Sequence, residues 1–155
     1  MRKKLEILEN IPDYLDDFIR LNEEWITSYF KIEEVDKLLA ANPYKIIENG
    51  GYIFTAISNG KVLGVCALFK ESDDVFELAR MAVSPNEQGK GIGNILIQTC
   101  LTKLKTIAAK KVYLVSNTKL ESAINLYKKH GFITKSLGQH PVYSRANIVM
   151  EQFIS

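Results

Sequence analysis

The 155-residue sequence has few of the residues that mark metalloproteins and disulfide-rich or membrane proteins. Its two cysteines, Cys66 and Cys100, show no metal-ligand spacing and are too few for a disulfide framework. No apolar run approaches the ~18 residues that a membrane helix needs. The basic start, residues 1–4, is not followed by an apolar segment, so we expect no signal peptide. These absences predict buried, reduced thiols, no metal site, no membrane partner and a cytoplasmic location.

What remains is the composition of an ordinary globular domain. Apolar residues make up 46% of the chain and charged residues 25%. A chain of this length can bury a stable core, and we find no internal repeat or linker-like segment. We therefore expect a single domain over residues 1–155.

Charge is distributed unevenly along the chain. Residues 1–88 carry 10 basic and 16 acidic side chains, whereas residues 89–155 carry 10 basic and only 2 acidic ones. The net charges are thus −6 and +8, which add up to the overall +2. Such asymmetry indicates a polyanionic partner for the second half, although two solvated surfaces of opposite sign would also produce it.

Hydrophobic periodicity and turn residues predict alternating strands and helices. Asn59-Gly60 lies between two β-rich runs and is typical of a two-residue hairpin turn, and Gly131 is a natural end for a helix. Both faces of the hairpin strands are apolar, so helices should cover both sides of the sheet. The order predicts a mixed sheet of the α/β or α+β class. The expected helices are residues 13–30, 33–41, 91–108 and 119–130, and the expected strands are 3–8, 51–58, 61–71, 75–83, 111–116, 132–137 and 147–154.

The glycine-rich stretch QGKGIG, residues 88–93, lies between an expected strand and an expected helix. It does not match a Walker loop, because Gly91 follows Lys90 where Ser or Thr is needed. It does not match a dinucleotide fingerprint either, because the last glycine is missing. Unpaired amides at a helix start favour an anion, and glycines let a phosphate approach the backbone. A tight turn without any ligand is the alternative.

Two longer motifs resemble the GNAT superfamily of acetyl-CoA-dependent N-acetyltransferases, including small bacterial members. ARMAVSPNEQGKGIG (79–93) is similar to the family's strand and pyrophosphate loop, and VYLVSNTKLESAINLYKKHGF (112–132) to its second strand and helix. Glu77 precedes Gln88 at the spacing of a general base in many members. The resemblance implies a largely antiparallel mixed sheet flanked by helices, in which the two central strands 75–83 and 111–116 splay apart.

The resemblance also implies a site for acetyl-CoA between the splayed strands. The pantetheine arm would run along the backbone of Met81, Ala82 and Val83. Lys90 would add charge to the phosphate loop, and Lys128 or Lys129 would meet the 3′-phosphate. Asn117 would contact the pantetheine or orient the next helix, with a plain turn or cap role as the alternative. The amides expected to hold the pyrophosphate are those of Gln88, Gly89, Lys90, Gly91, Ile92 and Gly93.

Two side chains match the catalytic positions of the family. An ammonium has no lone pair, and alkyl amines have pKa values near ~10, so a base such as Glu77 would help at neutral pH, directly or through water. Tyr127 would protonate the departing thiolate of CoA. The alternatives are a surface acid or a partner of Arg80 for Glu77, and a core residue for Tyr127. Transfer would be direct within a ternary complex, without an acetylated cysteine.

The acceptor site is less well defined by the sequence. The resemblance implies that the first helix and a late loop border it, although Trp25 could equally be a core residue. The acidic first half of the chain favours a cationic acceptor, whereas Arg145 favours a carboxylate such as that of an amino acid, and both remain open. The residues expected there are Asn22, Trp25, Ile26, Tyr29, Tyr143 and Arg145.

The sequence therefore predicts an N-acetyltransferase that moves an acetyl group from acetyl-CoA to a small primary amine or amino-acid-like metabolite. A catalytically silent acyl-CoA-binding sensor is the alternative. We expect no nucleic-acid partner, because basic and aromatic residues are not interleaved. The sequence leaves the oligomeric state open, a homodimer included.

Overall fold

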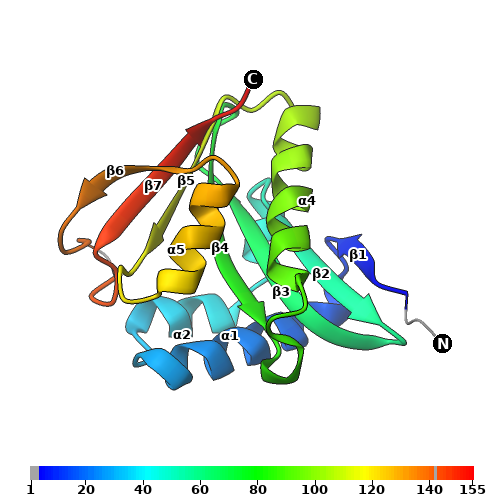
Figure 1. Cartoon of the computed structure of the whole chain (residues 1–155). Helices are drawn as coiled ribbons and strands as arrows, with labels where there is room; N and C mark the ends of the chain where they lie inside the picture. The colour runs from blue at the N-terminus through cyan, green and yellow to red at the C-terminus, as the bar shows by residue number, and fades with distance from the viewer. Residues whose placement is uncertain (1–3, 142) are drawn as a thin grey trace.

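A seven-stranded sheet, in the order β1-β2-β3-β4-β5-β7-β6, forms the centre of the molecule (Figure 1). The computed structural model describes residues 4–141 and 143–155. The strands are β1 (Glu6–Glu9), β2 (Tyr52–Ser58), β3 (Lys61–Lys70), β4 (Val75–Val83), β5 (Lys111–Ser116), β6 (Ile133–Leu137) and β7 (Ile148–Phe153). The helices are η1 (Pro12–Tyr14), α1 (Leu15–Tyr29), α2 (Glu34–Ala41), α3 (Lys45–Glu48), η2 (Pro85–Glu87), α4 (Ile92–Thr106) and α5 (Glu121–Lys129).

Strand pairing confirms the predicted fold class. The β4–β5 pair is parallel, and the other neighbouring pairs are antiparallel. The Asn59-Gly60 turn joins β2 to β3 with positive φ values of 52° and 74°, as a two-residue hairpin of type I′ requires. The four longer helices and all seven strands lie where the sequence predicts them, within a few residues. The short helix α3 was not predicted.

Helices cover both faces of the sheet (Figure 1). Alternate positions of the hairpin strands face opposite ways. Phe54 and Cys66 belong to the core under α4 and α5, whereas Ile53 and Val65 belong to the core under α1 and α3. This alternation follows from the two-residue period of a strand. Both faces of β2 and β3 are thus apolar and covered by helices, as predicted.

Both cysteines are fully buried, as predicted from the apolar runs around them. Their Sγ atoms lie 3.9 Å apart, and both thiols are free. Within residues 4–141 and 143–155, no helix is long and apolar enough to cross a membrane. The same residues contain no group of three or more His, Cys, Asp or Glu side chains that could hold a metal ion.

The sheet opens between β4 and β5. The two strands pair over three positions, from Val75 opposite Lys111 to Glu77 opposite Tyr113. Beyond Glu77 the β3–β4 register shifts, and Arg80 takes a φ of +58°. One extra residue of β4 is accommodated there, and such a bulge bends the strand that carries it. The predicted splay of 75–83 and 111–116 is therefore present, and its origin is this bulge.

Candidate functional site

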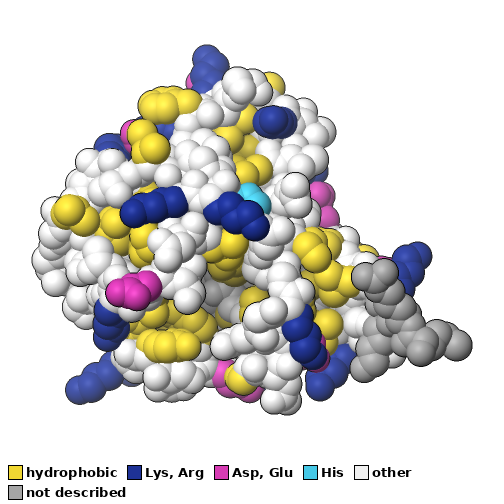
Figure 2. Space-filling model, in the orientation of Figure 1, with side chains coloured by type: hydrophobic (Ala, Val, Ile, Leu, Met, Phe, Trp, Pro, Cys, Tyr) yellow, Lys and Arg dark blue, Asp and Glu magenta, His cyan; other side chains and the backbone are white. Residues whose placement is uncertain are grey.

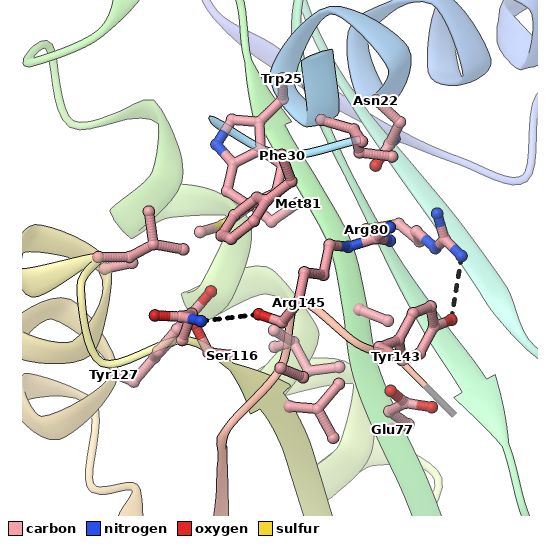
Figure 3. Close-up of a pocket in the computed structure, with 18 residues that line it drawn as sticks. Asn22, Trp25, Phe30, Glu77, Arg80, Met81, Ser116, Tyr127, Tyr143 and Arg145 are labelled. Atoms are coloured by element: carbon pink, nitrogen blue, oxygen red, sulfur yellow. Dashed lines mark hydrogen bonds between the residues drawn. The ribbon is translucent and has the colours of Figure 1, made fainter. Parts of the chain in front are cut away.

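A cavity of about 110 Å³ occupies the opening between β4 and β5 (Figure 3). Its walls come from five parts of the chain that are distant in sequence: α1 and the turn after it, β4, β5, α5 with the turn before it, and the loop between β6 and β7. Because the two strands separate here, the edge of β4 beyond Glu77 has no strand partner on the β5 side. The opening thus exposes backbone as well as side chains.

A groove leads from this cavity to the glycine-rich loop. Met81, Trp25, Leu120 and Ala123 line both the cavity and the groove, so the two are continuous. The groove passes between the end of β4 and the start of α5 and reaches the N-terminus of α4. Its lining includes Val83, Gln88, Gly89, Gly91, Ile92 and Gly93.

The glycine-rich loop offers backbone amides to a ligand. Gly89 and Gly91 have φ values of 80° and 82°, and a Cβ added at either would meet no atom within 4 Å. Among the described residues, the amides of positions 88–91 have no backbone partner, and the first turn of α4 contains no acid. Open amides at a helix start suit a phosphate. This loop is therefore chemically suited to a phosphate group, and its role in holding the pyrophosphate of CoA stays a prediction.

The expected charges around the loop are only partly in place. Lys90 pairs with Glu87 at 3.1 Å, is 62% exposed and does not line the groove. Lys128 and Lys129 are exposed on α5 and lie outside the groove lining, so a contact with the 3′-phosphate stays a prediction. Lys119, which the sequence analysis did not single out, does line it. On the face that carries α4 and α5, basic side chains outnumber acidic ones (Figure 2).

Among the backbone residues expected to guide the pantetheine arm, Met81 and Val83 line the groove. Ala82, between them, is 2% exposed and packs in the core under α1. Its side chain therefore faces away from the groove, as alternation along a strand requires. Ala82 can contribute only its backbone to this wall.

Glu77 lines the cavity at the point where β4 and β5 part. Burial raises the pKa of its carboxyl to about 7, and the negative charge of Glu71 adds to this effect. Arg80 and a hydrogen bond from Tyr113 oppose the shift without cancelling it. Arg80 forms its ion pair with Asp36, so Glu77 is neither a surface acid nor the salt-bridge partner of Arg80. A carboxyl with this pKa can accept a proton near neutral pH.

Tyr127 lines the same cavity from α5, and Figure 3 shows it on the opposite side of the view from Glu77. Its ring packs edge-on against Phe132, with centroids 6.1 Å apart, and contacts the core under α4. Burial raises the pKa of the phenol well above its ordinary value. Tyr127 therefore both lines the cavity, as predicted, and packs against the core, which was the alternative. Its phenol stays protonated at neutral pH.

Asn117 forms bonds within the protein. Its Nδ2 donates to the carbonyl of Arg145 at 2.8 Å, and its Oδ1 accepts from the amide of Lys119 at 3.0 Å. These bonds shape the turn before α5 and hold the loop between β6 and β7 against it. The turn role that the sequence left as an alternative is therefore present, and Asn117 also lines the cavity.

Five of the six residues expected at the acceptor site line the cavity: Asn22, Trp25, Ile26, Tyr143 and Arg145. Tyr29 is the exception. Its ring contacts that of Trp25 in a tilted arrangement with centroids 5.4 Å apart, and the residue is 48% exposed and lines the groove that leads to the glycine loop. Because Tyr29 lies one turn beyond Trp25 on α1, the helix carries it away from the cavity and toward the donor side.

A buried ionic cluster beside the cavity was missed by the sequence analysis. Asp36 on α2 accepts hydrogen bonds from Arg80 at 2.6 Å and from both terminal nitrogens of Arg145 at 2.7 and 2.8 Å. Glu33 accepts a further bond from Arg145, and the hydroxyl of Tyr143 accepts one from Arg80. These residues lie up to 112 positions apart, so no local pattern could have indicated the cluster.

The pKa of Asp36 is determined by its burial and by the hydrogen bonds that its carboxylate accepts. Burial by itself would raise the pKa of this carboxyl, but hydrogen bonds from Arg145, the Glu33 backbone and Arg80 outweigh it and lower the pKa to about 2. The Asp36 side chain is 2% exposed. The cluster thus joins α2 to the bulge of β4 and to the loop that carries Arg145.

The sequence model of the Acetyltransferase (GNAT) family matches residues 15–132. N-acetylaspartate synthetase of Xenopus tropicalis is 31% identical over 100 residues, which are 64% of this chain and 37% of that relative. Two solved structures share the fold over nearly the whole chain. An acetyltransferase of the GNAT family from Staphylococcus aureus has a TM-score of 0.87 at 21% identity, covering 98% of this chain and 100% of its own. Spermidine N-acetyltransferase of Vibrio cholerae, solved with CoA and spermine, has a TM-score of 0.75 at 22% identity, covering 97% and 95%.

The match to most of the chain, together with the split sheet and the open glycine loop, establishes the class of protein. The chain belongs to the acetyltransferase (GNAT) family. The resemblance drawn from the two motifs is therefore confirmed. The chain spans a little over a third of the length of the curated relative that it matches.

Replacing Asp36 by Asn should lower the free energy of unfolding at pH 7 by about 3 kcal/mol, because two buried arginines lose their shared counter-charge. A folded pKa of about 2, below the unfolded value, means that the carboxylate stabilises the fold above about pH 4 and that this contribution fades as the pH falls toward 2. Urea denaturation at pH 7 and pH 3 measures the deficit, which should shrink at pH 3. Asp74→Asn, at an exposed ion pair, is the control and should change little. Equal deficits at both pH values would contradict this account.

Proposed function

We propose that the protein is an acetyl-CoA-dependent N-acetyltransferase whose acceptor is a small primary amine or an amino-acid-like metabolite. The observation that carries the proposal is the continuous path from the open amides of the glycine loop to a cavity lined by Glu77 and Tyr127. The path suits a long thioester whose phosphates lie at one end and whose reactive carbonyl lies at the other. The name of the Xenopus relative, which specifies an N-acetylated amino acid as product, supports the acceptor class.

In the proposed reaction both substrates are bound together. The nitrogen of the free amine attacks the thioester carbonyl of acetyl-CoA, and Glu77 takes the proton that the nitrogen loses. The carbon–sulfur bond then breaks, and the sulfur departs as a thiolate. A backbone N–H near Val83 would polarise the carbonyl oxygen, since β4 has no strand partner on this side of the opening.

The role of Tyr127 in this scheme follows from its pKa. Thiols ionise near pH ~8.5, whereas the pKa of the buried Tyr127 phenol lies well above 10. Complete proton transfer from the phenol to the thiolate would therefore be uphill. We propose instead that Tyr127 donates a hydrogen bond to the departing sulfur and keeps its proton. This refines the general-acid role expected from the family.

Release of free thiol from acetyl-CoA, measured across a panel of small amines, tests the proposed activity. We expect at least one amine to accelerate release well above the background rate, and mass spectrometry should find the N-acetylated product. If acetyl-CoA binds but no amine accelerates release, the protein is a CoA-binding module without turnover, and the proposal fails.

Glu77→Gln should change the pH dependence of kcat/KM for the amine. Below pH 7 the wild-type rate should rise about a hundredfold per pH unit, because Glu77 and the amine must both lose a proton. Above pH 7 it should rise about tenfold per unit, from the amine alone. The Glu77→Gln enzyme should be slower and show the tenfold slope throughout.

Glu71→Gln is the matched control for this profile. The charge of Glu71 raises the pKa of Glu77, so removing it should move the break in the slope below pH 7 without abolishing it. An unchanged break in this variant, or a persisting break in Glu77→Gln, would show that another group is the base.

Tyr127→Phe should lower kcat by about 10- to 100-fold, the effect of losing one hydrogen bond to a charged group. Affinity for acetyl-CoA, measured by calorimetry, should stay nearly unchanged, because the ring remains in place against Phe132. Tyr44→Phe, at an exposed tyrosine, serves as the control. Undiminished turnover would remove Tyr127 from the mechanism, and a much larger loss would indicate complete proton transfer.

A further inference from the structure

Two arginines from different parts of the chain meet at the cavity. Arg80 comes from the bulge of β4 and Arg145 from the loop before β7, and both line the cavity with Glu77 (Figure 3). Their guanidinium carbons lie 5.5 and 4.9 Å from the centroid of the Tyr143 ring, so the two groups share one aromatic platform. Their side chains are only 8% and 13% exposed. Two nearly buried arginines therefore stand at the site of acetyl transfer.

The neighbouring carboxylates use only part of the donor capacity of these arginines. Each guanidinium has five N–H groups. Arg80 makes two side-chain hydrogen bonds, to Asp36 and Tyr143, and Arg145 makes three, to Asp36 and Glu33. Half of the N–H groups thus have no partner among the described residues. Among the described residues, no nitrogen of either arginine is both buried and without a hydrogen-bond partner, so the remaining N–H groups belong to nitrogens that already form one bond or that are accessible. These groups are available to a ligand oxygen.

A second opening reaches Arg80. A groove between α2, α3 and the end of β3 shares Arg80 and Tyr143 with the cavity. Lys45 and Lys70 also line it, and its described lining contains no acidic residue. Lys70 pairs with Asp73, which is 94% exposed and lies outside the lining. A path with this charge attracts anions and repels polycations.

We propose that the acetyl acceptor is a small amine that also carries a carboxylate, and that Arg80 and Arg145 bind this carboxylate while the amine faces Glu77. The inference rests on the proposed N-acetyltransferase function. A guanidinium can form charge-assisted hydrogen bonds to a carboxylate through more than one edge. The two terminal nitrogens of Arg145 already bond Asp36, so a ligand carboxylate would use the N–H groups that remain on Arg145 and Arg80. A polyamine would bring positive charge to two arginines and to the lysines of the second groove. Because Asp36 and Glu33 compensate the charges of the two arginines, the preference for a carboxylate would come from the remaining N–H groups and from Lys45 and Lys70.

A purely structural role for the cluster makes a different prediction. Arg80 and Arg145 also join α2 to β4 and to the late loop through Asp36. If this were their whole contribution, substitutions would lower stability or kcat for every amine alike. Carboxylate binding instead requires a loss that depends on whether the acceptor has a carboxylate.

Matched acceptor pairs separate the two accounts: glycine with glycinamide, and alanine with alaninamide. We expect kcat/KM, corrected for the fraction of free amine, to be at least about tenfold higher for an acid than for its amide. Arg80→Gln and Arg145→Gln should each reduce this preference at least about tenfold. Arg20→Gln, at an exposed arginine on α1, should leave it unchanged. Equal rates for acids and amides, or a preference for spermidine or O-phosphoethanolamine, would overturn the inference while leaving N-acetyl transfer intact.

Two further measurements test the inference if the arginine variants fail to fold or if the enzyme shows no turnover. Lys45→Gln and Lys70→Gln, at the rim of the second groove, should raise KM for the acids and not for the amides, and added salt should reduce this difference. Calorimetric titration of the same acids and amides into the protein with CoA reports binding without chemistry. Binding of acids over amides that Arg145→Gln weakens would uphold carboxylate binding by the two arginines even if the proposed acetyl transfer failed. Absence of any such preference would overturn it.

Discussion

Most of the candidate site depends on one interruption of backbone pairing, the separation of β4 from β5 after three residue pairs. A closed sheet would have filled this space with a ladder of hydrogen bonds. Because β4 accommodates an extra residue at Arg80, the strand bends and its edge becomes available. The same bulge directs Arg80 toward Asp36 and leaves Glu77 at the point where the strands part. The opening and the positions of Glu77 and Arg80 therefore share one origin.

The Asp36 cluster supports this arrangement from the other side of the cavity. A carboxylate that is 2% exposed would destabilise the fold if it had no partner, and two arginines compensate its charge. The cluster holds α2, β4 and the loop before β7 in fixed positions, and Asn117 ties the same loop to the turn before α5. The cavity is thus bordered by a charged, hydrogen-bonded cluster, whereas the groove that leads from it is lined by glycines and open amides. The two ends are suited to chemically different substrates.

Local patterns were sufficient for much of the fold. The sequence was enough to predict the Asn59-Gly60 turn, the glycine that ends α5 and the alternating strands, because each depends on neighbouring residues. The glycine loop and its position before α4 could be predicted for the same reason. The placement of Tyr29 on the donor side was not, since it depends on the direction in which one turn of α1 points. The cluster of Asp36, Arg80 and Arg145 had no local signature at all.

The sequence by itself determined the order of the elements, the two-sided burial of the sheet and the presence of a glycine-rich loop before α4, because these follow from short-range periodicity and turn chemistry. The motifs around Glu77 and Tyr127 were enough to indicate the family. Only the tertiary structure decided which charges meet. A bulge and a loop bring Arg80 and Arg145, 65 positions apart in numbering, onto one tyrosine ring. Such contacts arise from the packing of whole elements, and no spacing along the chain encodes them.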